Sequence, residues 1–372
     1  MHEYFMETAL NLAELGRGYT SPNPLVGAVI VKDGRIIGSG YHQKYGDWHA
    51  EIHALNSVSE SLEDATLYVT LEPCSHHGKT PPCCEAIVKS GIRKVVVATI
   101  DPNPLVSGRG IEYLRNHGVE VITDVLVERS VRMNEIFIKY VTSKKPFVLV
   151  KAAMTLDGKI ATVKLDSKWI SSDQSRMRVQ QLRKQFRSIL VGVGTVIADD
   201  PSLTCRLDED VIQPLRIIVD THGRIPLSSR VLNDEHRENT LIVMKDSVNH
   251  DIRLHIEEKG VKTLLVKLHK GKIDLRNLME HVGEMGIDSV LIEGGSEIIA
   301  SALSSNIVDK VMFFIAPKII GGRLAKSVVG GDGVDWMKDA LVIDEFMCER
   351  VGGDMVATGY IKGGDESCLP ES

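Results

Sequence analysis

Pro73-Cys74-Ser75-His76-His77-Gly78-Lys79-Thr80-Pro81-Pro82-Cys83 follows the tripeptide His49-Ala50-Glu51 in the first third of this chain. One imidazole and two thiolates are three ligands that suit a tetrahedral zinc ion and leave its fourth position for water. A closed structural site would need a fourth protein ligand. The pattern therefore predicts that His49, Cys74 and Cys83 bind zinc, with His49 at the start of a helix.

Glu51 lies two residues after His49, where its carboxylate can be near the metal without being a ligand. Zinc lowers the pKa of a bound water toward neutrality, so hydroxide is available near pH 7. A neighbouring carboxylate can take up that proton and return it to a leaving amine. Zinc-dependent nucleobase deaminases divide the work in this way, and their signature is H-x-E followed by P-C-x-x-C. Glu51 is therefore the expected proton shuttle.

The spacing between the two cysteines departs from that signature, because residues 75–82 separate Cys74 from Cys83. Cys84, His76 and His77 are therefore rival ligands. We favour Cys83, because Pro81-Pro82 stiffens the approach to it and Cys84 would face away at the start of the following helix. The alternative is a closed structural zinc site made by His49, Cys74, Cys83 and Cys84, which would leave Glu51 without a purpose.

The composition is that of a globular protein: 372 residues, 43% hydrophobic and 25% charged, with a formal net charge of −6. The length favours two domains, and the negative charge argues against a dedicated binder of nucleic acid or anionic membranes. Six cysteines, three of them clustered, indicate a metal site more than a disulfide scaffold. Residues 1–5 lack a cationic secretory start and no apolar run approaches about 20 residues, so we expect a cytoplasmic protein without membrane association.

Strands alternate with helices along the whole chain, which predicts layered α/β sheets. The polar, proline-punctuated run 142–146 precedes a fresh apolar strand, so we place a domain boundary there, giving domains 1–145 and 146–372. The polar tail after about residue 363 is expected to be loose. The expected strands are 27–31, 36–41, 66–70, 94–100, 120–122, 147–151, 188–193, 215–220, 240–244, 289–292 and 310–316, and the expected helices are 2–15, 49–57, 84–90, 111–116, 175–186 and 297–303.

The second half has no Rossmann-type fingerprint, because Ile197 stands where the third glycine after Gly192-Val193-Gly194 would be. Glu293-Gly294-Gly295-Ser296 lies between an apolar strand and a helix, a position that favours phosphate. Arg183 and Arg206 are candidates for a second phosphate. From these residues alone, this half is an anion-binding α/β domain.

Pro-Asn-Pro-Leu-Val occurs at residues 22–26 and again at 102–106, but the flanking sequences do not match. Two interpretations stand side by side. In one, these are ordinary Asn-Pro turns at strand ends. In the other, both turns line one pocket.

The motif from Pro73 to Cys83, eight-residue spacer included, resembles the bifunctional pyrimidine deaminase/reductases of riboflavin biosynthesis. The resemblance implies zinc bound by His49, Cys74 and Cys83, with Glu51 as proton shuttle, and an N-terminal cytidine-deaminase-like α/β/α layered sheet. It implies hydrolytic deamination of 2,5-diamino-6-ribosylamino-4(3H)-pyrimidinone 5′-phosphate. Candidate contacts for that substrate, each equally readable as a loop or capping residue, are Asn23, His76, Lys79, Asp101, Asn103 and Ser107.

Residues 151–159, 167–171, 194–204 and 293–295 look like the reductase half of the same family, which is similar to dihydrofolate reductase in fold. That half would use NADPH to reduce the ribosyl group to ribityl, giving 5-amino-6-(5-phosphoribitylamino)uracil. The resemblance implies cofactor contacts from Ala153, Trp169, Thr195, Asp199, Thr221, Gly295, Ser296, Glu297, Ile298, Ile299, Ala300 and Ser301. It implies contacts to the sugar phosphate from Ser167, Arg183, Leu203, Arg206 and Glu293. Without the matching segments, Trp169 would read as a core aromatic and Asp199 as a turn residue.

The hypothesis is therefore a bifunctional zinc hydrolase and NADP-dependent oxidoreductase that acts on a small pyrimidine ribosyl phosphate and forms a homo-oligomer. A second hypothesis is a single-function deaminase, for example one that acts on nucleic acid, with a C-terminal module that only binds. The net charge and the lack of interleaved aromatic and basic residues count against it. A third is a zinc-stabilised scaffold without catalysis.

Overall fold

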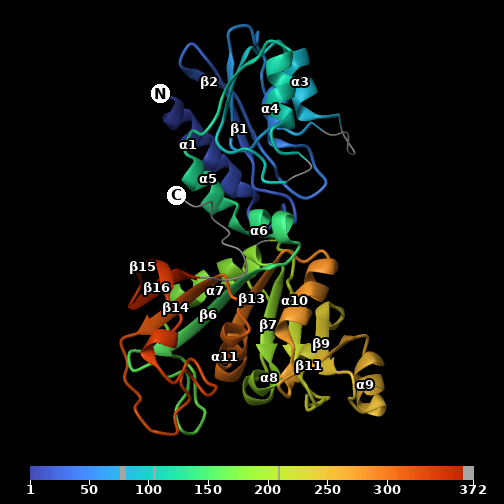
Figure 1. Ribbon diagram of the computed structural model, residues 1–372, viewed down its shortest axis with the longest axis vertical. Coiled ribbons are helices and arrows are strands. Elements are labelled where there is room, and N and C mark those ends of the chain that lie inside the picture. The colour runs from blue at the N-terminus through green and yellow to red at the C-terminus, as the bar shows by residue number, and fades with distance from the viewer. Residues whose placement is uncertain (76–80, 104–105, 208–209, 363–372) are drawn as a thin grey trace. The chain divides into compact units, whose positions relative to one another are not determined.

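The structure is a computed structural model, and it describes residues 1–75, 81–103, 106–207 and 210–362. The chain forms two compact units, Met1–Lys144 and Lys145–Ser372, each built around its own sheet (Figure 1). Within the described ranges, no helix has the length and apolar character needed to cross a bilayer.

The first unit contains a five-stranded sheet in the order β2-β1-β3-β4-β5. β1 pairs antiparallel with β2 and β3, whereas β3, β4 and β5 run parallel. Asp33 and Gly34 both have positive φ angles, of 51° and 75°, and form the tight turn that joins β1 to β2. The strands are β1 (Gly27–Lys32), β2 (Arg35–Tyr41), β3 (Thr66–Val69), β4 (Lys94–Val97) and β5 (Glu120–Ile122).

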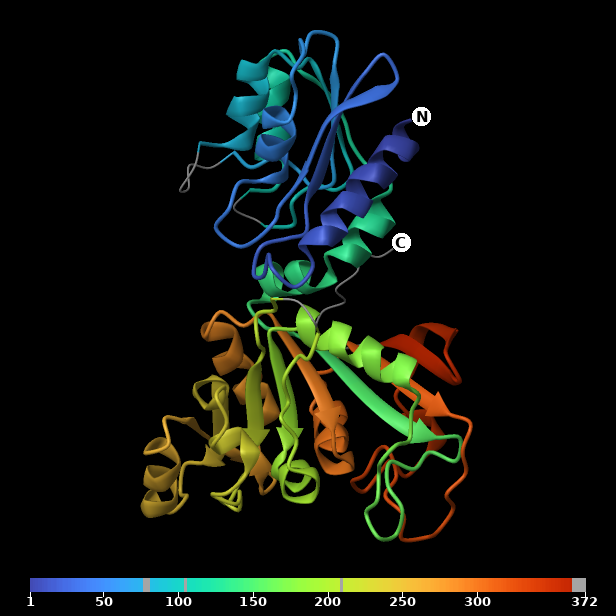
Figure 2. The same cartoon turned by 180° about the vertical axis from the view of Figure 1, so that it is seen from behind.

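Helices cover both faces of this sheet, which gives three layers (Figure 1, Figure 2). Successive side chains of a strand point to opposite faces. Val29 of β1 therefore packs with Phe5 of α1, while Ile30 packs with Ala54 of α2. The helices are α1 (His2–Ala13), α2 (Ala50–Asn56), α3 (Cys83–Ser90), α4 (Arg109–Asn116), α5 (Val127–Met133) and α6 (Glu135–Ser143), with a 3₁₀ turn η1 (Glu14–Gly16).

The second unit contains a nine-stranded sheet in the order β10-β9-β8-β7-β13-β6-β14-β16-β15. Neighbours run parallel from β10 to β14, and β16 and β15 add an antiparallel edge. Its strands are β6 (Phe147–Thr155), β7 (Ser188–Gly192), β8 (Leu215–Val219), β9 (Thr240–Lys245), β10 (Lys262–Val266), β13 (Ser289–Gly294), β14 (Lys310–Ala316), β15 (Ile343–Val351) and β16 (Asp354–Ile361).

The helices of this unit lie on both faces of the parallel strands, with α10 and α11 on one face and α7 on the other (Figure 1, Figure 2). Strands buried on both faces are apolar throughout, as in Val148, Leu149 and Val150 of β6. The helices are α7 (Asp173–Gln185), α8 (Val193–Asp199), α9 (His250–Glu257), α10 (Leu275–Glu284) and α11 (Ser296–Ser304). Shorter elements are η2 (Arg230–Leu232), η3 (Arg237–Asn239), η4 (Met337–Asp339), β11 (Leu268–His269) and β12 (Lys272–Ile273).

The order of the parallel strands identifies where a ligand would bind. β13 comes late in the sequence but pairs between β6 and β7, which come first. In open α/β sheets, ligands bind beyond the carboxyl ends of the strands, where the strand order reverses. The carboxyl ends of β6, β7 and β13 are therefore the expected binding edge of this unit.

The predicted fold class, two layered α/β units, is confirmed, and several element bounds differ from expectation. β6 continues to Thr155, beyond the predicted residue 151, because β14 pairs with it from Leu149 to Thr155. Residues 235–285, which carry no motif, fold into ordinary elements that include α9, β10 and α10. The tail after residue 363 lies outside the described residues.

Candidate functional site

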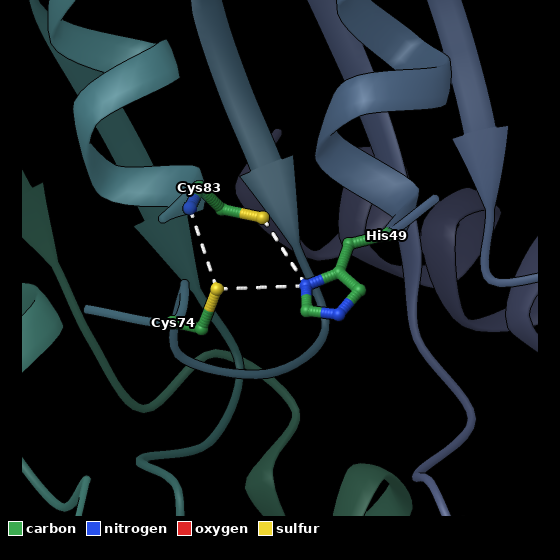
Figure 3. Close-up of side chains that lie close together, drawn as sticks. All are labelled: His49, Cys74 and Cys83. Carbon is green, nitrogen blue, oxygen red and sulfur yellow. Dashed lines mark hydrogen bonds between the residues drawn. The ribbon is translucent and has the colours of Figure 1, made fainter. Parts of the chain in front are cut away.

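Three elements of the first unit bring the predicted zinc ligands together (Figure 3). His49 is the N-cap of α2, Cys74 lies in the loop after β3, and Cys83 is the first residue of α3. His49 Nδ1 is 3.5 Å from Cys74 Sγ and 3.3 Å from Cys83 Sγ, and the Cys83 N–H donates to Cys74 Sγ at 3.3 Å. The three ligand atoms all lie within 4.8 Å of one another.

These separations fit a tetrahedral zinc ion. Zn–N and Zn–S bonds of about 2.1 and 2.3 Å at tetrahedral angles place N and S about 3.6 Å apart, close to the distances observed. Cys84 does not join the cluster that the described residues form, since its side chain belongs to the hydrophobic core with Ile87. His76 and His77, the other rival ligands, lie outside the described residues.

The two thiols of the cluster differ in acidity, and the thiolate is the form of cysteine that binds a metal. Hydrogen bonds from the Cys83 thiol and from His49 lower the pKa of the Cys74 thiol to about 4, against the effect of burial. The hydrogen bond to Cys74 in turn raises the pKa of His49 to about 9. The hydrogen bond to Cys74 and burial raise the pKa of the Cys83 thiol, so metal binding must release protons from Cys83 and His49.

Glu51 lies in the first turn of α2 and belongs to the cavity wall beside the cluster, not to the cluster itself. The residue is 3% exposed. Burial raises the pKa of its carboxyl to about 7, although His49 acts in the opposite direction. A carboxyl that titrates near neutrality can both accept and release a proton at working pH.

The cluster opens onto a cavity of about 450 Å³. Both Asn-Pro turns line it, through Asn23 and Asn103, which supports the second interpretation of the repeated pentapeptide. Its lining residues are Asn23, Pro24, Val26, His42, Tyr45, Gly46, Asp47, His49, Glu51, Leu71, Glu72, Cys74, Asp101, Asn103, Val106 and Phe137.

Sequence reasoning missed two buried polar residues of this wall, His42 and Glu72. His42 is 2% exposed; its Nε2 is 3.2 Å from the Asn23 amide nitrogen and its Nδ1 is 3.0 Å from the Trp48 carbonyl. Burial lowers the pKa of this imidazole. The signals available were weak, since a single histidine before a turn and a glutamate next to a proline are common in any chain.

The described lining residues carry carboxylates at Asp47, Glu51, Glu72 and Asp101 but no lysine or arginine. A phosphate in this cavity therefore requires a cation from another segment. The candidates His76 and Lys79 lie outside the described residues. Ser107, the other predicted contact of the 101–107 turn, donates its backbone N–H to the Asn103 carbonyl at 2.9 Å.

In the second unit, most predicted cofactor contacts gather at the carboxyl edge of the sheet. Ala153 is near the end of β6, Thr195 follows β7 in α8, and Thr221 follows β8. A Cβ on Gly295 would lie 3.5 Å from Thr195 Oγ1, so the starts of α8 and α11 are adjacent. This is the edge that the strand order selects for a ligand.

Not every residue of the 295–301 stretch faces solvent. Ile299 is 1% exposed and Ile298 is 8% exposed, and both side chains belong to the core under α11. Contacts from this stretch therefore fall to the backbone, including that of Gly295, and to the side chains of Ser296, Glu297, Ala300 and Ser301. Asp199 ends α8 and is exposed.

Arg183 and Glu293, both predicted to contact the sugar phosphate, bind each other. The Arg183 guanidinium donates from Nε to Oε1 at 2.7 Å and from Nη2 to Oε2 at 2.9 Å, and its Nη1 donates to the Thr204 carbonyl at 2.8 Å. Lys151, which the residue predictions did not include, also donates to Glu293 at 3.2 Å. Burial disfavours the charged carboxylate, but Arg183 and Lys151 outweigh it and lower the pKa of Glu293 to about 2.

The remaining predicted contacts lie on two loops. Leu203 and Arg206 lie on the loop after α8; Leu203 is 3% exposed, and Arg206 has a pKa lowered by burial and then by Arg183. Ser167 and Trp169 precede α7, and the Trp169 indole is 65% exposed. Lys318 Nζ donates to the Trp169 carbonyl at 2.6 Å, and the Arg176 guanidinium lies 4.6 Å from the indole centroid.

The two units of the chain match the models of two known protein families. Residues 1–99 match the family model described as the cytidine and deoxycytidylate deaminase zinc-binding region, and residues 146–356 match the RibD C-terminal domain. The chain is thus a zinc-binding deaminase unit followed by a reductase unit.

Full-length relatives then define the family. The chain is 46% identical over 355 residues to riboflavin biosynthesis protein RibD of Actinobacillus pleuropneumoniae, with 95% of this chain and 93% of that protein covered. It is 40% identical over 365 residues to RibD of Escherichia coli K12, with 95% and 97% covered. The chain belongs to the RibD family, as the motif from Pro73 to Cys83 indicates.

Solved structures agree along the whole chain. Acinetobacter baumannii RibD superposes with a TM-score of 0.87 at 35% identity, covering 97% of this chain and 99% of that one. A Thermotoga maritima protein described as a diaminohydroxyphosphoribosylaminopyrimidine deaminase/5-amino-6-(5-phosphoribosylamino)uracil reductase superposes with a TM-score of 0.84 at 40% identity, covering 97% and 98%.

Proposed function

We propose that this chain is a bifunctional enzyme of riboflavin biosynthesis. It hydrolyses the amine of 2,5-diamino-6-ribosylamino-4(3H)-pyrimidinone 5′-phosphate and then reduces the ribosyl side chain with NADPH, giving 5-amino-6-(5-phosphoribitylamino)uracil. The observation that carries the first half is the three-ligand cluster of His49, Cys74 and Cys83 beside the buried Glu51, in a cavity of about 450 Å³. Full-length similarity to RibD proteins supports both halves.

His49, Cys74 and Cys83 would hold the zinc ion, whose chemistry here is to acidify a water so that a nucleophile exists at neutral pH. Glu51 takes up a proton when water adds to the pyrimidine and returns it to the departing amine. Burial in the cavity wall raises the pKa of the Glu51 carboxyl to about 7, which suits a group that both accepts and releases a proton. The products are the oxo-pyrimidine and ammonia.

Asn23 and Asn103 are the described side chains best placed to orient the pyrimidine, since both line the cavity and carry donors and acceptors. The contact between Asn23 and His42 favours one orientation of the Asn23 amide. His76 and Lys79 are proposed for the substrate phosphate, because the described wall supplies no lysine or arginine.

In the second unit, NADPH would supply the hydride at the carboxyl edge of the sheet. We assign it to Ala153, Trp169, Thr195, Asp199, Thr221 and, in the 295–301 stretch, the residues other than the core side chains of Ile298 and Ile299. Arg206 is the proposed phosphate ligand, because three N–H donors of Arg183 already bind Glu293 and Thr204. Lys151, Arg183 and Glu293 carry one net positive charge, which adds to the attraction of the anionic substrate.

The two activities belong to consecutive parts of the chain. Residues 1–145 are the zinc-dependent pyrimidine deaminase domain, and residues 146–372 are the NADPH-dependent reductase domain. The enzyme acts on a small molecule, in the cytoplasm, as a homo-oligomer. A sedimentation or light-scattering measurement on the full chain tests the last statement, and a monomer at micromolar concentration contradicts it.

The test of the function is a sequential assay on the full chain with the diaminopyrimidine phosphate. We expect about one zinc ion per chain, ammonia release without NADPH, and NADPH oxidation only after ammonia has been released. Chelation of zinc should stop ammonia release while NADPH oxidation continues with the deaminated compound. Ammonia release without any NADPH oxidation would leave a single-function deaminase, and the absence of both would refute the proposal.

A further inference from the structure

Glu72 holds one segment of the deaminase cavity through its backbone. It follows β3, is 4% exposed and lies two residues before Cys74. Its Oε2 accepts the N–H groups of Asp101 at 3.1 Å and Gly108 at 2.9 Å. Its Oε1 accepts those of Gly110 at 2.8 Å and Ile111 at 3.3 Å.

These four donors all belong to the segment 101–111, which carries the cavity-lining residues Asp101, Asn103 and Val106. The first N–H groups of a helix have no partner inside the helix, and the N-terminus favours a negative charge. Glu72 satisfies this need for α4 from a distant part of the chain. One carboxylate therefore fixes both ends of the loop that leads into α4.

The carboxylate has no acceptor capacity left for a substrate. Two oxygens offer about four lone-pair sites, and the four backbone donors occupy them. Although Glu72 lines the cavity, it is therefore not placed to bind the pyrimidine. It also lies outside the His49, Cys74 and Cys83 cluster.

Gly110 also connects the start of α4 to the loop that carries Cys74, in this case by close packing. A Cβ on Gly110 would lie 2.0 Å from the Pro73 carbonyl oxygen and 3.2 Å from Glu72 Oε1. The start of α4 therefore rests directly on the residue that precedes Cys74. The segment 101–111 and the loop that carries Cys74 are fixed to each other at these two points.

We propose that Glu72 is a positioning residue for substrate binding in the deaminase site, and this rests on the proposed deaminase function. It holds the backbone of Asp101 and the start of α4, and Asp101 and Asn103 line the same cavity as the metal cluster. Its contribution appears in the affinity for the pyrimidine phosphate, because its contacts reach neither the ligand atoms nor the proton shuttle.

Glu72→Gln in the full chain tests this, because the new amide group meets two backbone donors with a donor of its own. We expect KM for the diaminopyrimidine phosphate to rise about tenfold or more, since small misplacements of binding groups are costly. We expect kcat within about threefold of the parent, the signature of lost binding. Zinc content and reduction of the supplied deaminated compound should be unchanged.

Glu112→Gln is the matched control, because it removes one carboxylate from the exposed side of the same helix, α4. It should leave KM at the parent value. Gly110→Ala leaves the Glu72 carboxylate in place, but its methyl group would press on the Pro73 carbonyl oxygen and on Glu72 Oε1 and displace the start of α4. It should raise KM in the same direction as Glu72→Gln.

A zinc-containing Glu72→Gln protein with the parent KM overturns the inference. Loss of zinc from Glu72→Gln also overturns it, because Glu72 would then support the metal loop itself. A parent enzyme that releases no ammonia refutes the proposed function instead, and the inference falls with it.

Discussion

The guanidinium of Arg183 and the carboxylate of Glu293 form a buried ion pair with two hydrogen bonds inside the second unit. Arg183 comes from α7 and Glu293 from the end of β13, and both side chains are at most 10% exposed. Lys151 of β6 binds the same carboxylate. The pair therefore ties a helix to the central strands directly beside the proposed cofactor edge.

Glu293→Gln should destabilise the second unit strongly. Removing one partner of a buried ion pair leaves an uncompensated charge and costs about 3–5 kcal/mol. Here two cations, Arg183 and Lys151, would lose their counterion. Urea unfolding at neutral pH measures the change, and Glu284→Gln, at a largely exposed carboxylate of α10, is the control that should stay near the parent.

The same pair predicts how stability depends on pH. The pKa of Glu293 is about 2 in the folded chain, against an ordinary value of 4.5 for a glutamate, so its stabilising contribution is complete above about pH 4.5. It is lost as pH falls from there toward 2. The difference in unfolding free energy between the parent and Glu293→Gln should therefore narrow below about pH 4.5, and a constant difference down to about pH 3 would contradict this.

Glu51→Ala should abolish deamination without affecting zinc binding or the reductase activity. Positioned proton transfer contributes about 10²- to 10⁴-fold to rate, so ammonia release should fall by at least about 100-fold. Zinc should remain, because Glu51 is not in the ligand cluster. NADPH oxidation should be intact when the deaminated intermediate is supplied, and ammonia release at the parent rate would show that Glu51 is not the shuttle.

Adjacent cysteines allow a matched test of the metal site. Cys83→Ser should lose zinc and deamination, because Cys83 Sγ faces His49 Nδ1 at 3.3 Å. Cys84→Ala should keep one zinc per chain and lose only about 1 kcal/mol of stability, because Cys84 is a core residue. The zinc content of the two purified variants tests this assignment. Loss of zinc from Cys84→Ala would instead support the closed structural site with four protein ligands.

Much of this arrangement could be predicted from the sequence because the signals are local or belong to a motif. The hairpin turn at Asp33-Gly34 and the period of the strands are local. The approach of His49 to Cys74 and Cys83 is not local, but the three residue types point to one metal chemistry. The two α/β units follow from the alternation of strands and helices.

Other features depend on tertiary structure that spacing does not reveal. The ion pair of Arg183 and Glu293 joins positions 110 residues apart, and an isolated arginine reads equally well as a phosphate ligand. The role of Glu72 could not be predicted for the same reason, because its four hydrogen-bond donors lie 29 to 39 residues further along the chain. The extension of β6 to Thr155 depends on pairing with β14, which follows much later.

Trp169→Ala should weaken NADPH binding without destabilising the fold. Its indole is 65% exposed, so little core packing is lost, while an aromatic face beside the proposed cofactor edge offers a stacking surface. Lys318 holds its carbonyl and Arg176 lies over its ring, so the indole is already oriented. We expect KM for NADPH to rise about tenfold, with the deaminase rate unchanged. Trp336→Ala, at a tryptophan that is 67% exposed in the same unit, is the control for loss of a surface indole. Equal KM values for NADPH in the two variants would place the cofactor away from residues 167–171.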